Sequence, residues 1–330
     1  MTGRACCLNA VHNVNAGRLT IASQDDHAGS VRAHVARVST ALLITCASVL
    51  LPQRVAAQAA TASVIRDNSF LVEEAYNQER GVVQHISVFS RSVDGTGWDF
   101  SFTQEWPAPG ERHQLSYTVP VEHHVEQGKG RTGLGDLALN YRYQVLGTDA
   151  VVAFAPRLTI MFPTGAHRRG FGSGGSTLQL NLPFSTTLPA NLAAHTNVGG
   201  SVTPRARDSM NNVGRAGDYF FGQSLIWLFR PSVNLMLEAR WRTSEEVVGA
   251  NRTQRVRELF IAPGIRAAID FASGLQIVPG VAYPIGVGPS SGDRSVLIYL
   301  SFEHPFRSPG PTSNEIWQSF AENQRLKPVR

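Results

Sequence analysis

Residues 137–145 read Leu-Ala-Leu-Asn-Tyr-Arg-Tyr-Gln-Val, a strict alternation of two kinds of side chain. The odd positions are apolar or aromatic, and the even positions are small or polar. Successive side chains of a β-strand point to opposite faces of the sheet, so this stretch predicts a strand with one apolar and one polar face. Residues 178–184 repeat the pattern, and residues 295–306 follow it less regularly, because Leu297 and Tyr299 fall on the polar face.

Alternating segments of this kind recur along the chain from Gly81 onward, and we predict twelve strands from them. Most of these segments are longer than the five or six residues that are usual in soluble sheets, and they match the roughly nine to eleven residues of a tilted membrane-spanning strand. The predicted ranges are 82–91, 97–105, 112–122, 134–146, 150–162, 176–187, 191–203, 217–229, 232–243, 256–270, 274–286 and 294–306.

The connections between the predicted strands are of two kinds, which alternate from the third strand onward. The short ones lie near 147–149, 188–190, 230–232 and 271–273, and the longer polar ones are 123–133, 163–175, 204–216, 244–255 and 287–293. Membrane barrels combine short periplasmic turns with longer outer loops, whereas a β-sandwich gives no reason for every second loop to be long. The sequence therefore predicts an all-β fold, a closed antiparallel transmembrane β-barrel of about twelve strands.

The composition of the two faces separates a membrane barrel from a soluble sandwich. The polar faces carry mainly Gly, Ser, Thr, Asn and Gln with scattered Arg and Glu, which fits a lumen better than a water-exposed surface. No apolar run reaches the roughly 18 residues of a membrane-spanning helix. Aromatic residues near the strand ends suggest the interfacial girdles of a barrel. They are Trp98, Trp106, Tyr141, Tyr143, Phe162, Trp241 and Phe306.

The first 59 residues have the layout of a leader with a secretory signal peptide, preceded by an unusually long start. Arg32 and Arg37 precede the apolar run 41–51, and Ala57-Gln58-Ala59 fits a cleavage site. A membrane anchor is the alternative, but this run is too short to span about 30 Å as a helix. All three cysteines lie in the leader. We therefore expect export through the periplasm to the bacterial outer membrane, and a mature chain without cysteine.

Three segments follow the leader. Residues 60–81 include the apolar and acidic stretch 70–76, which is either a short plug helix in or under the pore or a mobile periplasmic lead-in. Residues 82–306 form the predicted outer-membrane barrel. Residues 307–330 begin with a break rich in Pro and Gly and are expected to form a periplasmic C-terminal tail.

The net charge gives no support for a nucleic-acid partner. The whole chain carries +5, but residues 60–330 hold 25 basic and 23 acidic residues, a net charge of only +2. The partners that we expect are outer-membrane lipid and a small-molecule solute, and the sequence leaves the oligomeric state open.

Several short stretches resemble, in order, a family of bacterial outer-membrane proteins. The stretches are 73–79, 81–85, 102–107, 112–117, 133–137, 141–143, 156–159 and 163–165. The family is that of the transporters named for the MetA pathway of phenol degradation, and the resemblance covers roughly residues 70–306. It implies passage of small aromatic or hydrophobic compounds, and it supplies no catalytic residues. One departure is the tail of 24 residues after Phe306, because outer-membrane strands often finish the chain on an aromatic residue.

The polar faces supply the candidate functional residues, which we expect to line the pore. They are Asp136, Asn140, Arg142, Gln144, Arg157, Asn181, Asn234, Glu238, Arg240, Arg242, Glu258, Arg266 and Asp270. Two readings stay open for them. Paired charges can fill and rigidify a narrow barrel, or an excess of Arg can form a constriction that selects solutes by charge.

The second of these readings makes a prediction for two arginines. Replacing Arg142 or Arg240 by Ala is expected to change the conductance or the ion preference in planar bilayers, because each would remove a positive charge from the lumen. Unchanged single-channel behaviour would make both residues structural.

The candidate motifs for cofactor and metal binding lack the structural context that such sites need. The Gly-rich stretches 133–136 and 170–175 lack the strand before and helix after that a phosphate loop needs, so we interpret them as turn and loop glycines. His123 and His124 lie near Glu122 and Glu126, but adjacent strand residues point to opposite faces and no third ligand is suitably spaced. We therefore expect no cofactor and no metal.

The sequence favours a passive channel or facilitator for small molecules and not an enzyme. One alternative is an outer-membrane lipid hydrolase, for which His85-Ile86-Ser87 is the nearest motif, although Val88 and Phe89 follow in place of the expected Asn and Gly. The other alternative is a structural or adhesive barrel without transport.

Overall fold

The computed structural model describes residues 65, 67–126, 128–147 and 149–306. The predicted leader 1–59 and the predicted tail 307–330 lie outside the described residues. The described part of the chain is almost entirely β-structure, with sixteen strands and two short 3-10 helices. Within it, no helix has the length and apolar character needed to cross a membrane.

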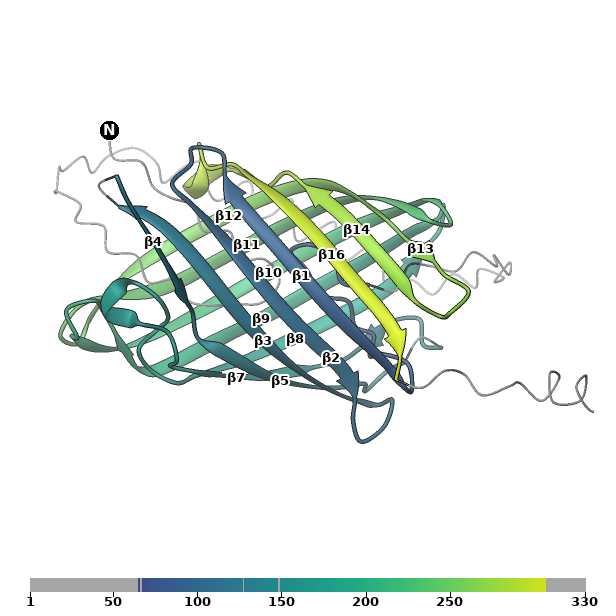
Figure 1. Ribbon diagram of the computed structural model, residues 1–330, viewed down its shortest axis with the longest axis horizontal. Helices are drawn as coiled ribbons and strands as arrows, with labels where there is room; N and C mark the ends of the chain where they lie inside the picture. Colours follow the sequence, from purple (N-terminus) through teal and green to yellow (C-terminus); the bar gives the residue numbers. More distant parts are fainter. Residues whose placement is uncertain (1–64, 66, 127, 148, 307–330) are drawn as a thin grey trace, which may run out of the picture. The chain divides into compact units, whose positions relative to one another are not determined.

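The strands follow one another around a single sheet (Figure 1). They are β1 (Val82–Ser92), β2 (Gly97–Pro107), β3 (His113–Glu126), β4 (Lys129–Leu134), β5 (Leu137–Tyr143), β6 (Ala153–Phe154), β7 (Arg157–Phe162), β8 (Thr177–Leu188), β9 (Leu192–Arg207), β10 (Val213–Arg230), β11 (Val233–Gly249), β12 (Arg252–Ala267), β13 (Ile269–Asp270), β14 (Gln276–Ala282), β15 (Ile285–Gly286) and β16 (Ser295–Pro305). The 3-10 helices are η1 (His167–Arg169) and η2 (Gly288–Ser290).

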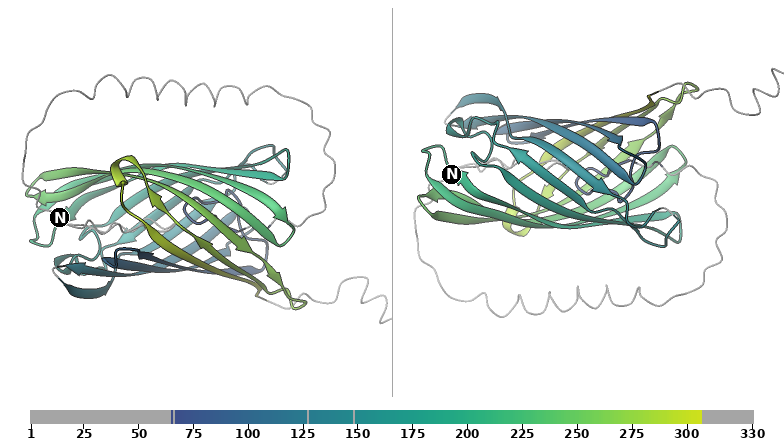
Figure 2. Two further views of the ribbon diagram at one scale, coloured as in Figure 1. Left: turned by 90° about the horizontal axis from the view of Figure 1, so that it is seen from above. Right: turned by 90° about the horizontal axis from the view of Figure 1, so that it is seen from below.

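The sheet closes on itself as a barrel. Four pairs of consecutive strands (β4 with β5, β6 with β7, β12 with β13, β14 with β15) are interrupted parts of one wall strand, so the sixteen strands make twelve. Every wall strand pairs antiparallel with its neighbours in sequence, and β16 returns to pair with β1. Figures 1 and 2 show the strands slanting around the barrel. This confirms the predicted closed antiparallel barrel of about twelve strands.

The two faces of the wall differ as the alternation predicts. On β5, Leu139 is 46% exposed on the outer face, whereas its neighbour Asn140 is 2% exposed on the inner face. Outward apolar side chains continue around the barrel, and aromatic ones such as Tyr141, Phe162 and Trp241 are among them. A water-exposed surface would not carry so continuous an apolar band, whereas lipid accommodates it.

The connections differ from the prediction at one end of the barrel. We call the end where β1 begins and β16 ends the turn end, and the opposite end the loop end; Val82 pairs with Pro305 at the turn end. Long loops were predicted at the loop end. Loops 163–175 and 287–293 are present, but 123–133, 204–216 and 244–255 are largely strand.

The three segments that were wrongly predicted to be loops are extensions of the barrel wall. β3 and β4 form a hairpin through 123–133, and β9 to β12 reach 16 to 18 residues in length. At about 3.3 Å per residue, 18 residues span about 60 Å, far more than a tilted strand needs for an apolar band about 25 Å tall. Polar side chains on both faces indicate a wall that continues into water, as the exposed Arg255–Glu245 ion pair at 3.2 Å illustrates.

The inner face of the wall is divided into two sectors. Strands β1, β14 and β16 turn apolar residues inward, including Ile86, Val88 and Leu297, whereas β3 to β9 turn mainly polar residues inward. This explains why Leu297 and Tyr299 fall on the polar face of the predicted strand. They face an apolar part of the lumen.

Candidate functional site

Nine of the predicted pore-lining residues are buried on the inner face of the barrel. These are Asp136, Asn140, Arg142, Arg157, Asn181, Asn234, Glu238, Arg242 and Arg266. Gln144, Arg240 and Glu258 are half-buried. Asp270 was predicted to line the pore, and this prediction is wrong. It lies exposed on β13 at the turn end, where it accepts a hydrogen bond from Gln276 at 2.6 Å, because the inward alternation ends at Ala268.

The lumen beside these residues is occupied by the chain itself. Residues 67–79, which we call the lumenal segment, precede β1 and lie inside the barrel in an extended and turning conformation. Phe70, Val72 and Ala75 in this segment are completely buried. The segment contains no helix, and its backbone is bonded to side chains of the wall.

From Leu71 to Asn77, every second backbone N–H of the lumenal segment donates to an inward side chain. Leu71 N donates to Glu238 Oε2 at 2.7 Å, and Glu73 N to Asn197 Oδ1 at 2.8 Å. Ala75 N donates to Ser185 Oγ at 2.7 Å. Within the described part of the chain, none of the strand pairings includes this segment. Its backbone is therefore satisfied by polar side chains of the lumen and not by a sheet edge.

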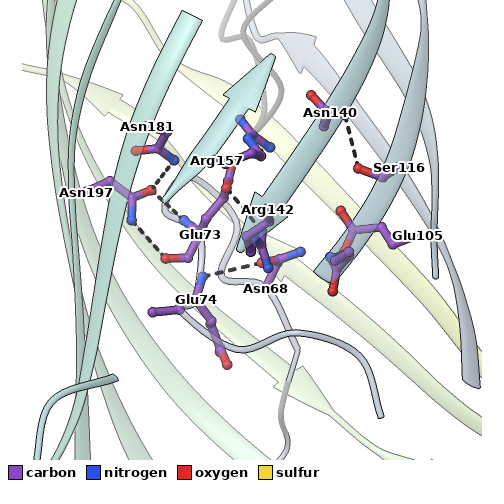
Figure 3. A network of polar contacts seen from close by, with 12 residues as sticks. Asn68, Glu73, Glu74, Glu105, Ser116, Asn140, Arg142, Arg157, Asn181 and Asn197 are labelled. Atoms are coloured by element: carbon purple, nitrogen blue, oxygen red, sulfur yellow. Dashed lines mark hydrogen bonds and ion pairs between the residues drawn. The ribbon is translucent and has the colours of Figure 1, made fainter. Parts of the chain in front are cut away.

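Charged groups hold the middle of the segment. The Glu73 carboxylate lies between two arginines, with Oε1 2.5 Å from Arg157 Nη1 and Oε2 3.2 Å from Arg142 Nη2 (Figure 3). All three side chains are at most 3% exposed. Removing one partner would leave a buried charge without compensation, which typically costs about 3–5 kcal/mol.

A second cluster holds the beginning of the segment near the turn end. Arg266 donates to the backbone oxygens of Ile65, Asp67 and Asn68, and its Nη2 lies 3.1 Å from Glu74 Oε1. Asp67 accepts hydrogen bonds from Gln84 and from the Tyr299 hydroxyl. Arg266 was predicted to line a pore, but its donors are directed at the lumenal segment.

Phe70 fixes the apolar side of the segment. Its ring lies edge-on to Tyr299, with centroids 5.8 Å apart. A Cβ at Gly264 or at Gly280 would come within 2.5 Å of a ring carbon, so both positions must be glycine for the ring to fit. Gly264 on β12, Gly280 on β14 and Tyr299 on β16 thus form a cradle for the Phe70 ring. The sequence signal for it was the pair Leu297 and Tyr299 on a polar face.

A loop narrows the lumen at the loop end. Residues 163–176 fold back so that Phe171 is completely buried and stacks on His124. Asp136 holds this loop by accepting from Gly165 N at 3.0 Å and Ser173 N at 2.7 Å. Gly172 has φ +73°, and a Cβ there would lie 2.2 Å from Asp136 Oδ1, so glycine is required. Asp136 is thus a loop anchor.

Between the loop and the lumenal segment lie the remaining charged candidates. Arg242 Nη2 is 2.5 Å from Asp218 Oδ2, and the Arg240 guanidinium lies 5.9 Å from the centroid of the Phe220 ring. Glu258 pairs in register with Arg242 on the neighbouring strand. These contacts agree with the alternative in which paired charges fill and rigidify the barrel. Selection of solutes by charge stays a proposal.

The residues considered for metal binding and hydrolysis lie apart from the lumenal segment. His124 is 3.2 Å from Glu122, while His123 stacks on Trp98. Among the described residues, no group of three or more His, Cys, Asp or Glu side chains could hold a metal ion. His85 is on the outer face near the turn end, with its Nε2 3.2 Å from His304 Nε2.

Solved structures show the same fold. An outer-membrane channel from Pseudomonas putida is similar with a TM-score of 0.52 and 13% identity, over 70% of this chain and 97% of that chain. The NanC porin is similar with a TM-score of 0.46 and 9% identity, over 66% of this chain and 98% of that chain. No family model matches the chain, and no curated protein does. The similarity to the Pseudomonas channel shows that the described residues have the fold of an outer-membrane β-barrel.

Proposed function

We propose that this protein is a passive outer-membrane channel for small molecules, whose lumen is closed by the lumenal segment. The observation that carries the proposal is the way the segment is held. Wall side chains bind it, and none of the described strand pairings includes it, so it can leave without opening the barrel.

The outer-membrane setting orients the barrel. The longer loops and extended hairpins of membrane barrels lie on the outer side, so we expect the turn end and the entry of the lumenal segment to face the periplasm. The resemblance to the MetA transporters favours aromatic or hydrophobic compounds as the solute class. The apolar sector formed by Ile86, Val88 and Leu297 supports this class, because release of the lumenal segment, which belongs to the same buried cluster, would expose it to such compounds.

Gly280→Ala tests the proposal. The new methyl group would overlap the Phe70 ring, whose nearest carbon is 2.5 Å from that position. Overpacking of this kind costs about 1–3 kcal/mol, which would raise the released fraction about 5- to 150-fold. We expect higher mean conductance in planar bilayers and faster swelling of liposomes in neutral solutes.

The matched control is Gly249→Ala, at a position where a Cβ would have no contact shorter than 3.8 Å. It should conduct like the wild-type protein. A barrel that stays impermeable with Gly280→Ala, despite displacement of the Phe70 ring, would contradict the channel.

A catalytic function is not part of the proposal. The hydrolase alternative requires His85 to act on lipid, and its ring nitrogen lies beside that of His304 at the turn end. A phospholipid hydrolysis assay on the wild-type protein and on His85→Ala distinguishes the two functions. Turnover that disappears in the variant would favour the enzyme.

A further inference from the structure

The Glu73 carboxylate occupies a site that belongs to the barrel wall. Arg142 on β5 and Arg157 on β7 are directly opposite each other in the strand register, and both point inward. Like charges in that position destabilise a sheet unless an anion lies between them. Glu73 is that anion, with one oxygen on each guanidinium (Figure 3).

The wall retains a positive charge here when Glu73 is removed. Glu105 on β2 lies in the same part of the lumen (Figure 3) and accepts a hydrogen bond from Gln114 at 2.7 Å. Two arginines and one glutamate leave an excess of one positive charge. The lumenal segment neutralises it, and an anionic solute could do the same.

The site also has unused hydrogen-bond donors. Nε of Arg142, Nε of Arg157 and Nε2 of Gln179 are buried and have no hydrogen-bond partner among the described residues. Buried donors without partners are uncommon in native proteins and call for a reason. A carboxylate that is not tethered to the chain can lie against these donors, which Glu73 leaves without a partner.

An apolar surface accompanies the charged site within the same lumen. Phe70, three residues before Glu73, fills the cradle of Gly264, Gly280 and Tyr299. The lumenal segment thus presents an aromatic ring and a carboxylate to two different parts of the wall. Arg pairs bind carboxylates through fixed, bidentate geometry, and an aromatic ring adds apolar contact.

We propose that Arg142 and Arg157 form a binding site for carboxylate solutes with an apolar body, and that Glu73 fills this site as an internal substitute. The inference rests on the proposed channel function and names its solute class. A carboxylate solute competes with Glu73 for the two arginines and thereby favours release of the lumenal segment. The apparent affinity of the wild-type protein is reduced by the fraction of time that Glu73 occupies the site.

The test is calorimetric titration of the purified full chain with benzoate, with benzyl alcohol as the uncharged match. Glu73→Gln should bind benzoate at least about tenfold more tightly than wild type, because the competing carboxylate is gone. Glu73→Gln combined with Arg157→Gln should lose that binding. Arg255→Gln, which removes an equal charge from the exposed wall extension, should bind benzoate like wild type.

Gly280→Ala provides a second route that leaves the charged groups intact. It displaces the segment through Phe70, so it should also tighten benzoate binding. Equal affinity of Glu73→Gln for benzoate and benzyl alcohol, or no gain over wild type in either variant, would overturn the carboxylate site.

Conductance of the same preparations separates this inference from the channel function. A Gly280→Ala protein that conducts but does not bind benzoate would support the channel function and contradict the carboxylate site. Benzoate binding to Glu73→Gln in a barrel that does not conduct would support the carboxylate site and contradict the channel function.

Discussion

Oxidation of a protein that carries Val72→Cys and Gly222→Cys is expected to abolish its conductance, and reduction is expected to restore it. Val72 lies at the inner turn of the lumenal segment, and Gly222 faces it from β10. The Val72 Cβ is 3.9 Å from the position of a Cβ at Gly222. Disulfides have Cβ···Cβ distances of about 3.5–4.5 Å, so the two cysteines can join without moving the backbone.

The effect is large because a covalent bond replaces contacts that open and close. In the proposed channel, the ion pairs and hydrogen bonds release the segment for part of the time, whereas a disulfide keeps it in place until the disulfide is reduced. Single-channel recording before and after addition of a thiol reductant measures both states in one experiment. The native cysteines Cys6, Cys7 and Cys46 should be replaced by Ser to make the assignment unambiguous.

The two single-cysteine variants are the controls, because each carries one substitution and cannot form the bridge. Neither should respond to reductant. If mass spectrometry shows the disulfide and conductance persists, the solute path does not run past the lumenal segment.

The barrel was predictable from sequence because its signal is local. A wall strand shows its two environments within nine residues, as Leu139 and Asn140 do on β5. The closure of the sheet then follows from an even number of strands and from the cost of an unpaired edge in lipid. Strand positions agree with the prediction within a few residues along most of the chain.

The wall extensions were mistaken for loops because their composition is the same. Above the apolar band both faces of a strand meet water, so the alternation that marks a membrane strand disappears. Residues 244–255 are charged and polar in either conformation, yet Glu245 and Arg255 are cross-strand partners. Only pairing between strands distinguishes the two, and pairing cannot be read from one segment alone.

The lumenal segment was the least predictable feature because its contacts are far apart in sequence. Glu73 meets Arg142 and Arg157, and Glu74 meets Arg266 at a separation of 192 residues. Nine of the candidate residues are buried on the inner face, whereas Asp270 is exposed, and the partners of these residues could not be assigned from the sequence. Tyr299 on a polar face was a sign that something apolar fills the lumen.

Leu180→Arg is expected to destabilise the barrel strongly in lipid. Leu180 is 47% exposed on β8, in a run of outward apolar residues that includes Leu178 and Leu182. Arginine at the middle of a lipid-facing strand costs about 2–4 kcal/mol, whereas the cost near the interface is about 0–1 kcal/mol. Urea unfolding in phospholipid vesicles, followed by tryptophan fluorescence, measures the change in the free energy of unfolding.

Thr253→Arg is the matched control, because Thr253 is exposed on the extension of β12 beyond the apolar band. It introduces the same side chain on a wall strand and should change the free energy of unfolding by less than about 1 kcal/mol. Contact with lipid is the difference in environment that this comparison is designed to test. Equal stabilities for the two variants would mean that Leu180 faces water, and the outer-membrane assignment would then lose its physical basis.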